Sequence, residues 1–416
     1  MYNRSKFLLI VLSTVFVFYA VVGGLLGRAT EREGAYSQLS VFNEVLSKIR
    51  TSYVEDPNFT EVMHGALRGL LESLDPYSTY LPPDEYARYK KHKTNGNGGV
   101  GIELSKEKML GYAYVIHPIE GGPASKAGVR AGDVIESIEE VSTRDTSLLQ
   151  VEYLLTGNPG SPMKLKILRR GRTEPLELTV TRELVKVPPV KASLLESKIG
   201  YVKIYRFAPG ISEDVRTRLQ QLTKTGASRV ILDLRNCAGD EFEEGIKVAN
   251  LFLDHGVITY ALGQKSPKKE FVADPGRVVC RLPMVVLQNY GSASAAEIVC
   301  AAIKENRRGE LVGMKSFGKA SLQKLILLES DSAVLLSTAK FYSQSGKVIQ
   351  GNGITPDFEV RDGLEAIQDD SDLQEDEESE ENVSPPQNKP ASQEDLQLKK
   401  AIELLNTPVS ERQKAA

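Results

Sequence analysis

Apolar residues follow three different spacings along this chain, and each spacing predicts a different kind of element. In residues 36–92 they recur every three or four positions, which is typical of amphipathic helices. From about Gly98 onwards, short runs separated by turn residues predict β-strands. After Pro188 and Pro189, apolar strands alternate with helical patterns, and this order indicates a layered α/β domain.

Individual strands and helices are predicted in these last two parts. The strand-rich part contains GVGIEL, YAYVIHPI, DVIESI, KLKILRR and LELTVTREL. In the α/β part, strands are predicted at IGYVKIYRF, RVILDLRN, PMVVLQN, ELVGM and SAVLLSTAKFY. Helices are predicted there over residues 214–225, 243–253 and 294–306.

The N-terminus carries a long apolar segment. Residues Phe7 to Leu26 contain no charge and follow Arg4 and Lys6. This length matches the ~20 residues of a membrane-spanning helix and predicts an anchor. The alternative is a cleaved secretory signal, although the run exceeds the ~7–15 residues of a signal's apolar core. In both cases the basic N-terminus predicts that the rest of the chain is extracytoplasmic, and periplasmic in a two-membrane cell.

The C-terminal part changes composition sharply. Residues 369–381 read DDSDLQEDEESEE, a run of like charge that predicts disorder. A helical pattern then starts near Ser392, and this helix is expected to dock on the core or on a second subunit of a homo-oligomer. The predicted organisation is an anchor or signal (1–27), a helical N-terminal region (28–95), a β-rich domain (96–185), an α/β core (186–362), an acidic linker (363–391) and a C-terminal helix and tail (392–416).

Composition narrows the classes of partner. The chain has 416 residues, 41% of them apolar, and a formal net charge of −3, so nothing in its bulk charge favours binding to nucleic acid. The three cysteines, Cys237, Cys280 and Cys300, form no C-x-x-C pair, and the four histidines are scattered. We therefore expect no metal site, and no cofactor is needed for the chemistry considered below.

Two segments in the α/β part carry candidate chemistry. Ser294 and Glu297 match a capping box, so the ordinary interpretation is that Ser294 only begins a helix. A helix N-terminus also suits a nucleophile, because its free N–H groups, such as that of Ala295, can stabilise an oxyanion. Lys319 lies between apolar segments, and burial would lower the pKa of its amine and make it a base.

Several ordered motifs within residues 35–362 resemble the carboxyl-terminal processing peptidases, or tail-specific proteases. These are LESLDPYSTYLPPDEY, LDLRNCAGD, GSASAAEI, GMKSFGKASLQ and KFYSQSGKVIQGNGITPD. The resemblance implies an α/β protease core with an inserted PDZ domain. It also implies that Ser294 is the nucleophile, Lys319 the general base and Gln323 the residue that positions the lysine. Gly239 or its neighbour would supply the second oxyanion donor beside the N–H of Ala295.

The segment GGVGIEL resembles the carboxylate-binding loop and adjoining strand of a PDZ domain. Its predicted tail-binding residues are Gly99, Val100, Gly101 and Ile102. A PDZ domain adds a C-terminal peptide as an extra strand, and backbone N–H groups hold the terminal carboxylate. The expected partners are therefore proteins with exposed apolar C-termini.

The chain departs from the family pattern at two positions. Asp240 replaces a glycine and brings a carboxylate close to the developing negative charge. Thr156 stands where many members have an arginine, which puts a link between the PDZ domain and the active site in doubt. The prediction is an exported Ser-Lys endopeptidase that reads C-terminal tails, and the alternative is a non-catalytic PDZ adaptor with a degenerate protease fold.

Overall fold

The computed structural model describes residues 14–18, 39–92, 98–106, 111–144, 146–361 and 394–407. The chain divides into two compact units, Met1–Leu67 and Arg68–Ala416. Among the described residues no helix has the length and apolarity needed to cross a bilayer. The predicted anchor over Phe7–Leu26 falls outside the described residues, apart from a short helical stretch at 14–18.

The N-terminal helical prediction is confirmed where the structure describes it. Residues 39–52 form a helix, and α2 (Phe59–Glu72) and α3 (Pro83–His92) follow. The side chains of α2 are all at least partly accessible, although its sequence is amphipathic. The chain between α2 and α3 forms a short strand, β1 (Thr79–Leu81).

The strand-rich segment folds as one antiparallel sheet in the order β2-β3-β4-β6-β7, with β5 on β4. Its strands are β2 (Ile102–Lys106), β3 (Ala113–Pro118), β4 (Val134–Ile138), β5 (Val141–Ser142), β6 (Pro162–Leu168) and β7 (Leu176–Thr181), and its helices are α4 (Pro123–Lys126) and α5 (Leu148–Leu155). Apolar side chains from this sheet and from α5 form a separate core around Ile135, Val151 and Leu165. All five predicted strands are confirmed, and β2 stands at one end of the sheet order.

The α/β part is built on a six-stranded sheet in the order β17-β14-β13-β10-β9-β8. The strands are β8 (Lys191–Leu195), β9 (Ile199–Lys203), β10 (Arg229–Asp233), β13 (Met284–Gln288), β14 (Glu310–Gly313) and β17 (Phe358–Glu359). All neighbours are parallel except β8, which runs antiparallel to β9. A short 3-10 turn at Glu196–Lys198 joins β8 to β9, and another lies at Pro275–Arg277.

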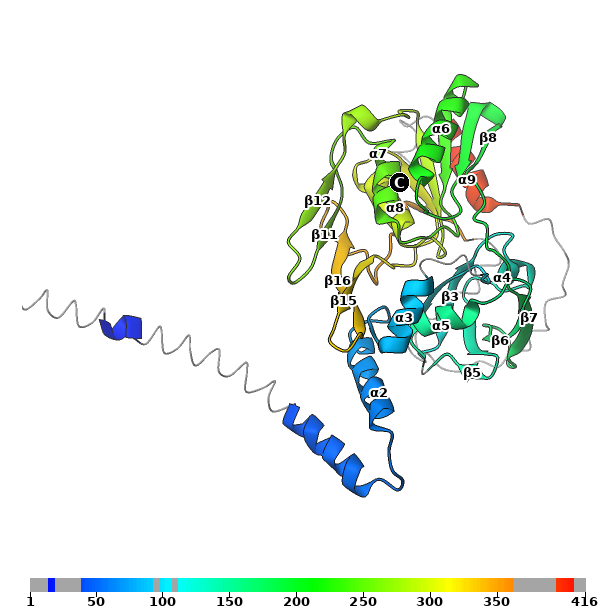
Figure 1. Ribbon diagram of the computed structural model, residues 1–416. Coiled ribbons are helices and arrows are strands. Elements are labelled where there is room, and N and C mark those ends of the chain that lie inside the picture. Colours follow the sequence, from blue (N-terminus) through cyan, green and yellow to red (C-terminus); the bar gives the residue numbers. More distant parts are fainter. Residues whose placement is uncertain are drawn as a thin grey trace, which may run out of the picture. The chain divides into compact units, whose positions relative to one another are not determined.

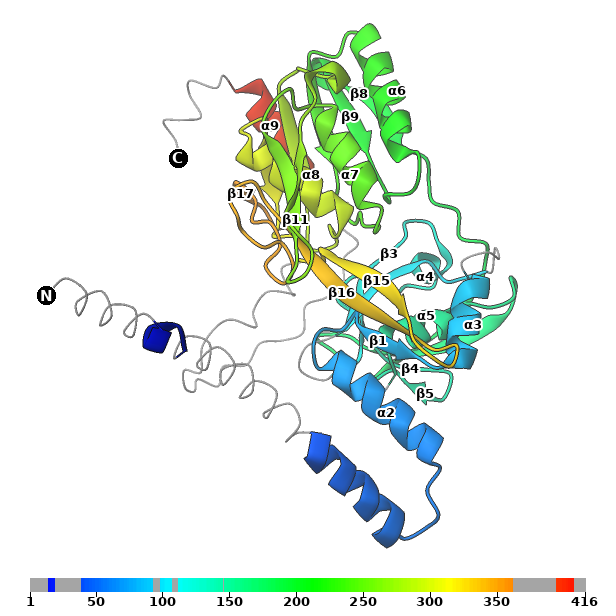
Figure 2. The same cartoon turned by 60° about the vertical axis from the view of Figure 1, so that its left-hand side comes forward.

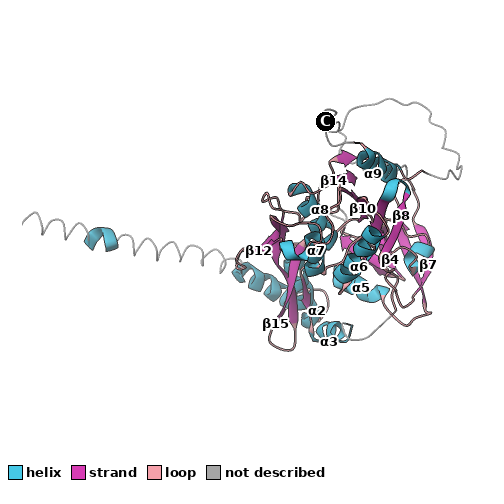
Figure 3. Ribbon diagram, turned by 90° about the horizontal axis from the view of Figure 1, so that it is seen from above, coloured by secondary structure: helices cyan, strands magenta, loops and turns pink. Residues whose placement is uncertain are grey.

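Helices cover both faces of this sheet, as a parallel sheet requires (Figures 1 and 2). On one face α6 (Ile211–Lys224), α7 (Phe242–Asn250) and α8 (Ala295–Glu305) pack side by side (Figure 3). The other face is covered by α9 (Leu396–Asn406), the predicted C-terminal helix. An apolar core lies on each face of the sheet, and strand β10 contributes to both. Val230 and Leu232 point into the core on the side of α6, α7 and α8, whereas Ile231 packs with α9 on the other side.

A third, antiparallel sheet has the order β1-β16-β11-β12, with β15 paired to β16. Its strands besides β1 are β11 (Val257–Leu262), β12 (Lys269–Val272), β15 (Ser321–Leu327) and β16 (Ala333–Tyr342). Because β1 comes from the segment before the PDZ-like sheet, this pairing joins chain segments that are far apart: Thr79 lies opposite Leu335. The sequence patterns did not predict β1, β5, β8, β11, β12, β15 or β17.

Candidate functional site

The carboxyl ends of three neighbouring strands bring together part of the predicted site and Arg206, which was not predicted. Arg206 follows β9, Asp240 follows β10 and Ser294 follows β13, and these strands are adjacent in the sheet. Ligands of open α/β sheets bind at this edge, because the loops there converge. An isolated bridge between Arg206 and Ala238 continues the pairing of β9 and β10 beyond the strands proper.

Ser294 lies at the start of α8, as its sequence motif predicts. Its backbone is at φ 56° and ψ −121°, a strained conformation for a residue with a side chain. The residue is fully buried, and its backbone N–H donates to Glu297 Oε2 at 3.1 Å. Its hydroxyl donates to Asp240 Oδ1 at 2.7 Å. The capping arrangement is therefore present, and the same serine also makes a charge-assisted hydrogen bond.

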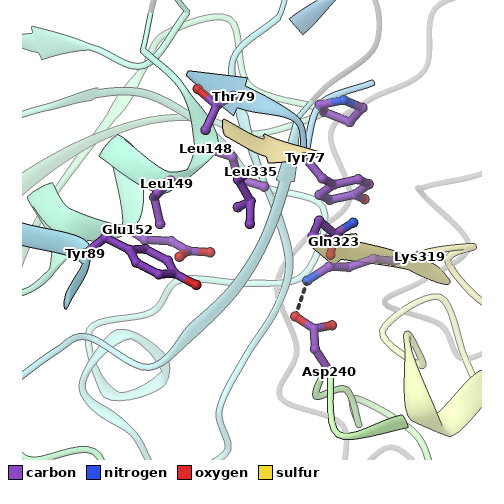
Figure 4. A pocket seen from close by; sticks show the side chains of 11 residues that line it. Tyr77, Thr79, Tyr89, Leu148, Leu149, Glu152, Asp240, Lys319, Gln323 and Leu335 are labelled. Atoms are coloured by element: carbon purple, nitrogen blue, oxygen red, sulfur yellow. Dashed lines mark hydrogen bonds and ion pairs between the residues drawn. The ribbon is translucent and has the colours of Figure 1, made fainter. Parts of the chain in front are cut away.

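Lys319 precedes β15 and is held by two carboxylates. Its Nζ lies 2.7 Å from Glu103 Oε1 and 3.5 Å from Asp240 Oδ2, and Figure 4 shows the latter pair. Arg206 donates to the other oxygen of Glu103 at 2.8 Å. Asp240 therefore lies between Ser294 and Lys319, and among the described residues no hydrogen bond joins these two side chains directly.

These partners decide the charge of the lysine. Burial by itself would lower the pKa of Lys319, but the carboxylates of Asp240 and Glu103 outweigh it and raise that pKa above its ordinary value. Lys319 and Arg206 likewise overcome the effect of burial on Glu103 and hold its pKa well below the usual range. The prediction of a neutral, low-pKa Lys319 is wrong for this arrangement, because it took no account of the carboxylate of Glu103.

Glu297 connects Ser294 to the loop that carries Lys319. Four groups donate to its carboxylate: the N–H groups of Ser294, Gly318 and Lys319 at 3.1, 2.7 and 2.9 Å, and the hydroxyl of Ser316 at 2.6 Å. Its side chain is fully buried, and burial raises its pKa to about 7 although these donors act against the rise. Glu297 thus fixes the backbones of Ser294 and Lys319 relative to each other.

Gln323 points its amide elsewhere in this structure. It lies on β15 and donates to Ser321 Oγ at 2.8 Å and to Ser337 Oγ at 3.2 Å. Within the described residues it makes no hydrogen bond to Lys319, although both side chains line the same pocket. Its predicted role in positioning the lysine stays a prediction.

The two predicted oxyanion donors face each other. The N–H of Ala295 donates to the carbonyl oxygen of Gly239 at 3.3 Å. Gly239 has φ 128°, and a Cβ there would clash with the carbonyl of Phe207, so only glycine fits. Its own N–H donates to no acceptor in the described part of the chain. An oxyanion hole at this place requires the Gly239 carbonyl to turn away from Ala295.

The predicted tail-binding loop has free donors. Ala124 and Ile119 donate to the carbonyls of Val100 and Gly101, at 2.9 and 2.8 Å. The N–H groups of Val100 and Gly101 themselves meet no acceptor among the described residues. Gly99 is paired with Glu183, and Ile102 begins strand β2. The loop therefore offers two backbone donors next to an end strand, which is the geometry that captures a carboxylate.

Sequence reasoning missed Glu103, which lies on β2, and Arg206, which lies in the segment after β9. A register shift between Glu103 and Leu104 breaks the alternation of β2, so that Glu103, Leu104 and Ser105 are all buried. A bulge of this kind re-aims a side chain, and an acidic residue inside an apolar strand was the available signal. Thr156, by contrast, only ends α5 and bonds to the carbonyl of Tyr153 at 2.9 Å.

Comparisons with known proteins cover most of the chain. Residues 198–360 match peptidase family S41 and residues 98–180 match the PDZ domain. The carboxy-terminal-processing protease of Bartonella bacilliformis is 36% identical over 338 residues, 80% of this chain and 77% of that protein. The carboxy-terminal processing protease CtpA of Bacillus subtilis is 30% identical over 349 residues, 83% and 74% of the two chains. Among solved structures, a photosystem II D1 C-terminal processing protease matches with a TM-score of 0.67 and 28% identity, covering 76% of this chain and 86% of the other.

Proposed function

The chain belongs to peptidase family S41 with the carboxy-terminal processing proteases, and on this premise we propose that it is a serine endopeptidase that forms an acyl-enzyme on Ser294. The observation that supports this best is that one buried carboxylate, Glu297, accepts hydrogen bonds from the backbone N–H groups of both Ser294 and Lys319 and so holds the two segments together. The strained turn at Ser294 and the N-terminus of α8 are suited to acyl transfer, since free N–H groups gather there.

In the proposed reaction Lys319 acts as the general base. It must first leave Glu103 and Asp240, because an ammonium group cannot accept the Ser294 proton. Away from these carboxylates, burial lowers the pKa of the amine toward neutrality. The serine oxygen then attacks the scissile carbonyl, and the protonated lysine passes its proton to the leaving amine. Water hydrolyses the acyl-enzyme, and the N–H groups of Ala295 and Gly239 stabilise the oxyanion in both steps.

The PDZ domain is proposed to deliver protein C-termini to this site. The free N–H groups of Val100 and Gly101 would hold the terminal carboxylate, and the tail would add to the sheet beside β2. Glu103 lies on that same strand and binds Lys319. The bound tail and the carboxylate that holds Lys319 are therefore both on β2, so tail binding can affect the release of Lys319. The proposed partners are proteins with exposed apolar C-termini.

Replacing Glu103 with glutamine is expected to move the acidic limb of the pH–activity profile. The change removes the nearest carboxylate from Lys319, so the pKa of the lysine falls and activity appears at lower pH. We expect a downward shift of about one pH unit or more, measured as kcat/KM for a tail peptide from pH 5 to pH 10. Glu183→Gln, which breaks an exposed pair with Lys126 on the same domain, serves as the control. An unchanged profile in Glu103→Gln would refute the role given to this pair.

The alternative function is a non-catalytic PDZ adaptor, which the carboxylate of Asp240 beside Ser294 favours. Treatment with a serine-directed phosphonate probe separates the two. The protease predicts covalent labelling at Ser294, located by peptide mass spectrometry, together with cleavage of an unstructured substrate bearing an apolar tail. An adaptor would bind the tail but show neither labelling nor cleavage.

The proposed setting is the outer side of the cytoplasmic membrane, and it rests on Phe7–Leu26 with its basic flank. Protease digestion of intact spheroplasts tests it, since an exported chain is degraded while a cytoplasmic marker survives. Protection of the chain in that experiment would exclude export.

A further inference from the structure

A pocket with a volume of about 180 Å³ lies beside Lys319 and Asp240, and Asp240 is the residue that bonds to Ser294. It is lined by Pro76, Tyr77, Thr79, Tyr89, Leu148, Leu149, Glu152, Asp240, Lys319, Gln323 and Leu335 (Figure 4). The volume lies below the ~300–1,000 Å³ typical of small-molecule sites, so a single long side chain suits it better than a cofactor. Since Asp240 bonds to Ser294, a side chain in this pocket belongs to a substrate residue near the scissile bond.

The charges in and around the pocket are unevenly paired. Lys319 is neutralised by Asp240 and by Glu103, whose other oxygen binds Arg206. Glu152, on helix α5, also lines the pocket but makes no hydrogen bond or ion pair within the described part of the chain. Glu152 therefore has no direct ionic partner among the described residues, and it faces a space that also borders Lys319 and Asp240.

The remaining wall is suited to an aliphatic stem. Leu148, Leu149 and Leu335 contribute apolar surface, and the ring of Tyr89 lines the same space. Lysine and arginine bury their methylene groups against such surface while their charged ends reach a polar partner. An aromatic ring adds a favourable contact for a cation, as the ring of Tyr77 does for Lys319 Nζ at 5.7 Å.

We propose that this pocket binds a lysine or arginine side chain of the substrate, with Glu152 as the residue that determines the preference. The inference rests on the proposed function, because it assigns a substrate feature to the same site. It adds a cationic residue, close to the cleaved bond, to the apolar C-terminus that the PDZ loop is proposed to hold. Glu152 acts on binding and does not take part in the chemical steps.

The raised pKa of Glu152 is consistent with a carboxylate that has no direct ionic partner. Although Glu152 is an exposed residue, desolvation of its carboxyl by the groups around it raises its pKa to about 7. Lys319 and Arg206 lower this pKa, whereas Glu103 and Asp240 raise it, and desolvation is the largest cause. An incoming cation would stabilise the ionised form, so the preference for a cation should be stronger at pH 8 than at pH 6.

The test measures tail binding apart from cleavage. Full-length Ser294→Ala is titrated with fluorescent peptides that share one apolar C-terminus and carry a single lysine at successive positions. The matched peptides carry norleucine, which has a similar chain without the amine. At one position we expect lysine to tighten binding about tenfold, the size of one charge-assisted hydrogen bond in a partly desolvated site.

In the Ser294→Ala background, Glu152→Gln should abolish this difference, and Glu140→Gln, at an exposed position of the same domain, should retain it. A lysine preference that persists in Glu152→Gln, or that occurs at no position, overturns the inference. If the wild-type chain cleaves these peptides without any preference, only the inference fails. If binding shows the preference but the wild type never cleaves, the inference stands and the proposed protease activity fails.

Discussion

Ser294→Ala is expected to abolish cleavage of a tail peptide, lowering kcat by a factor on the order of 10⁴–10⁶. The substitution removes the only atom that can form the acyl-enzyme, whereas the backbone bond from Ser294 to Glu297 does not depend on the side chain. Lys319→Ala should lower kcat by about 10²–10⁴, the usual range for loss of a general base. Both are measured by single-turnover cleavage of an unstructured substrate.

The controls for this pair separate chemistry from folding. Lys315→Ala changes an exposed lysine four positions before Lys319 in the same loop and should leave kcat unchanged. Ser294→Ala should bind the tail peptide as tightly as the wild type, because the PDZ loop is untouched. Equal proteolysis by the wild type, Ser294→Ala and Lys319→Ala would rule out the proposed mechanism.

Glu297→Ala is expected to cost both stability and activity. The change leaves four buried donors without an acceptor, from Ser294, Ser316, Gly318 and Lys319. An unsatisfied buried group costs about 1–3 kcal/mol, so we expect a loss on the order of 4 kcal/mol after partial relaxation. Urea denaturation measures this loss, and kcat measured where the variant is fully folded should still fall, because the nucleophile and lysine loops separate.

Glu305→Ala provides the matched control, since Glu305 ends the same helix and bonds only to Ser345 near the surface. Its effect should remain below about 1 kcal/mol, with kcat unchanged. Wild-type kcat in folded Glu297→Ala would show that Glu297 contributes stability alone and does not position Ser294 and Lys319.

The parts of the fold that sequence patterns predicted are those with strong periodicity. Strands β9, β10 and β13 are continuous apolar runs, because helices cover both faces of the parallel sheet. Strand β15 was missed, since only Ser321 of its seven residues is buried and it gains order by pairing with β16. An edge hairpin of this kind has little apolar alternation to detect.

Site residues whose place depends on neighbouring positions in the sequence were predicted, whereas contacts between distant segments were missed. The place of Ser294 before α8 follows from its capping pattern, and the structure brings the N–H of Ala295 beside Gly239. The charge of Lys319 depends on Glu103, which a bulge in β2 turns inward toward a loop far along the chain. No local spacing can indicate which groups two distant segments place in contact.

The pair formed by Glu103 and Lys319 spans 216 positions of sequence. Closing so long a loop is entropically costly, so the contact forms only when both flanking segments are already in place. In an unfolded chain Lys319 is therefore not positioned to act as a base. Once the chain has folded, the amine is held in an ion pair with Glu103. Under the proposed mechanism, neighbouring proteins are spared until a suitable C-terminus is presented.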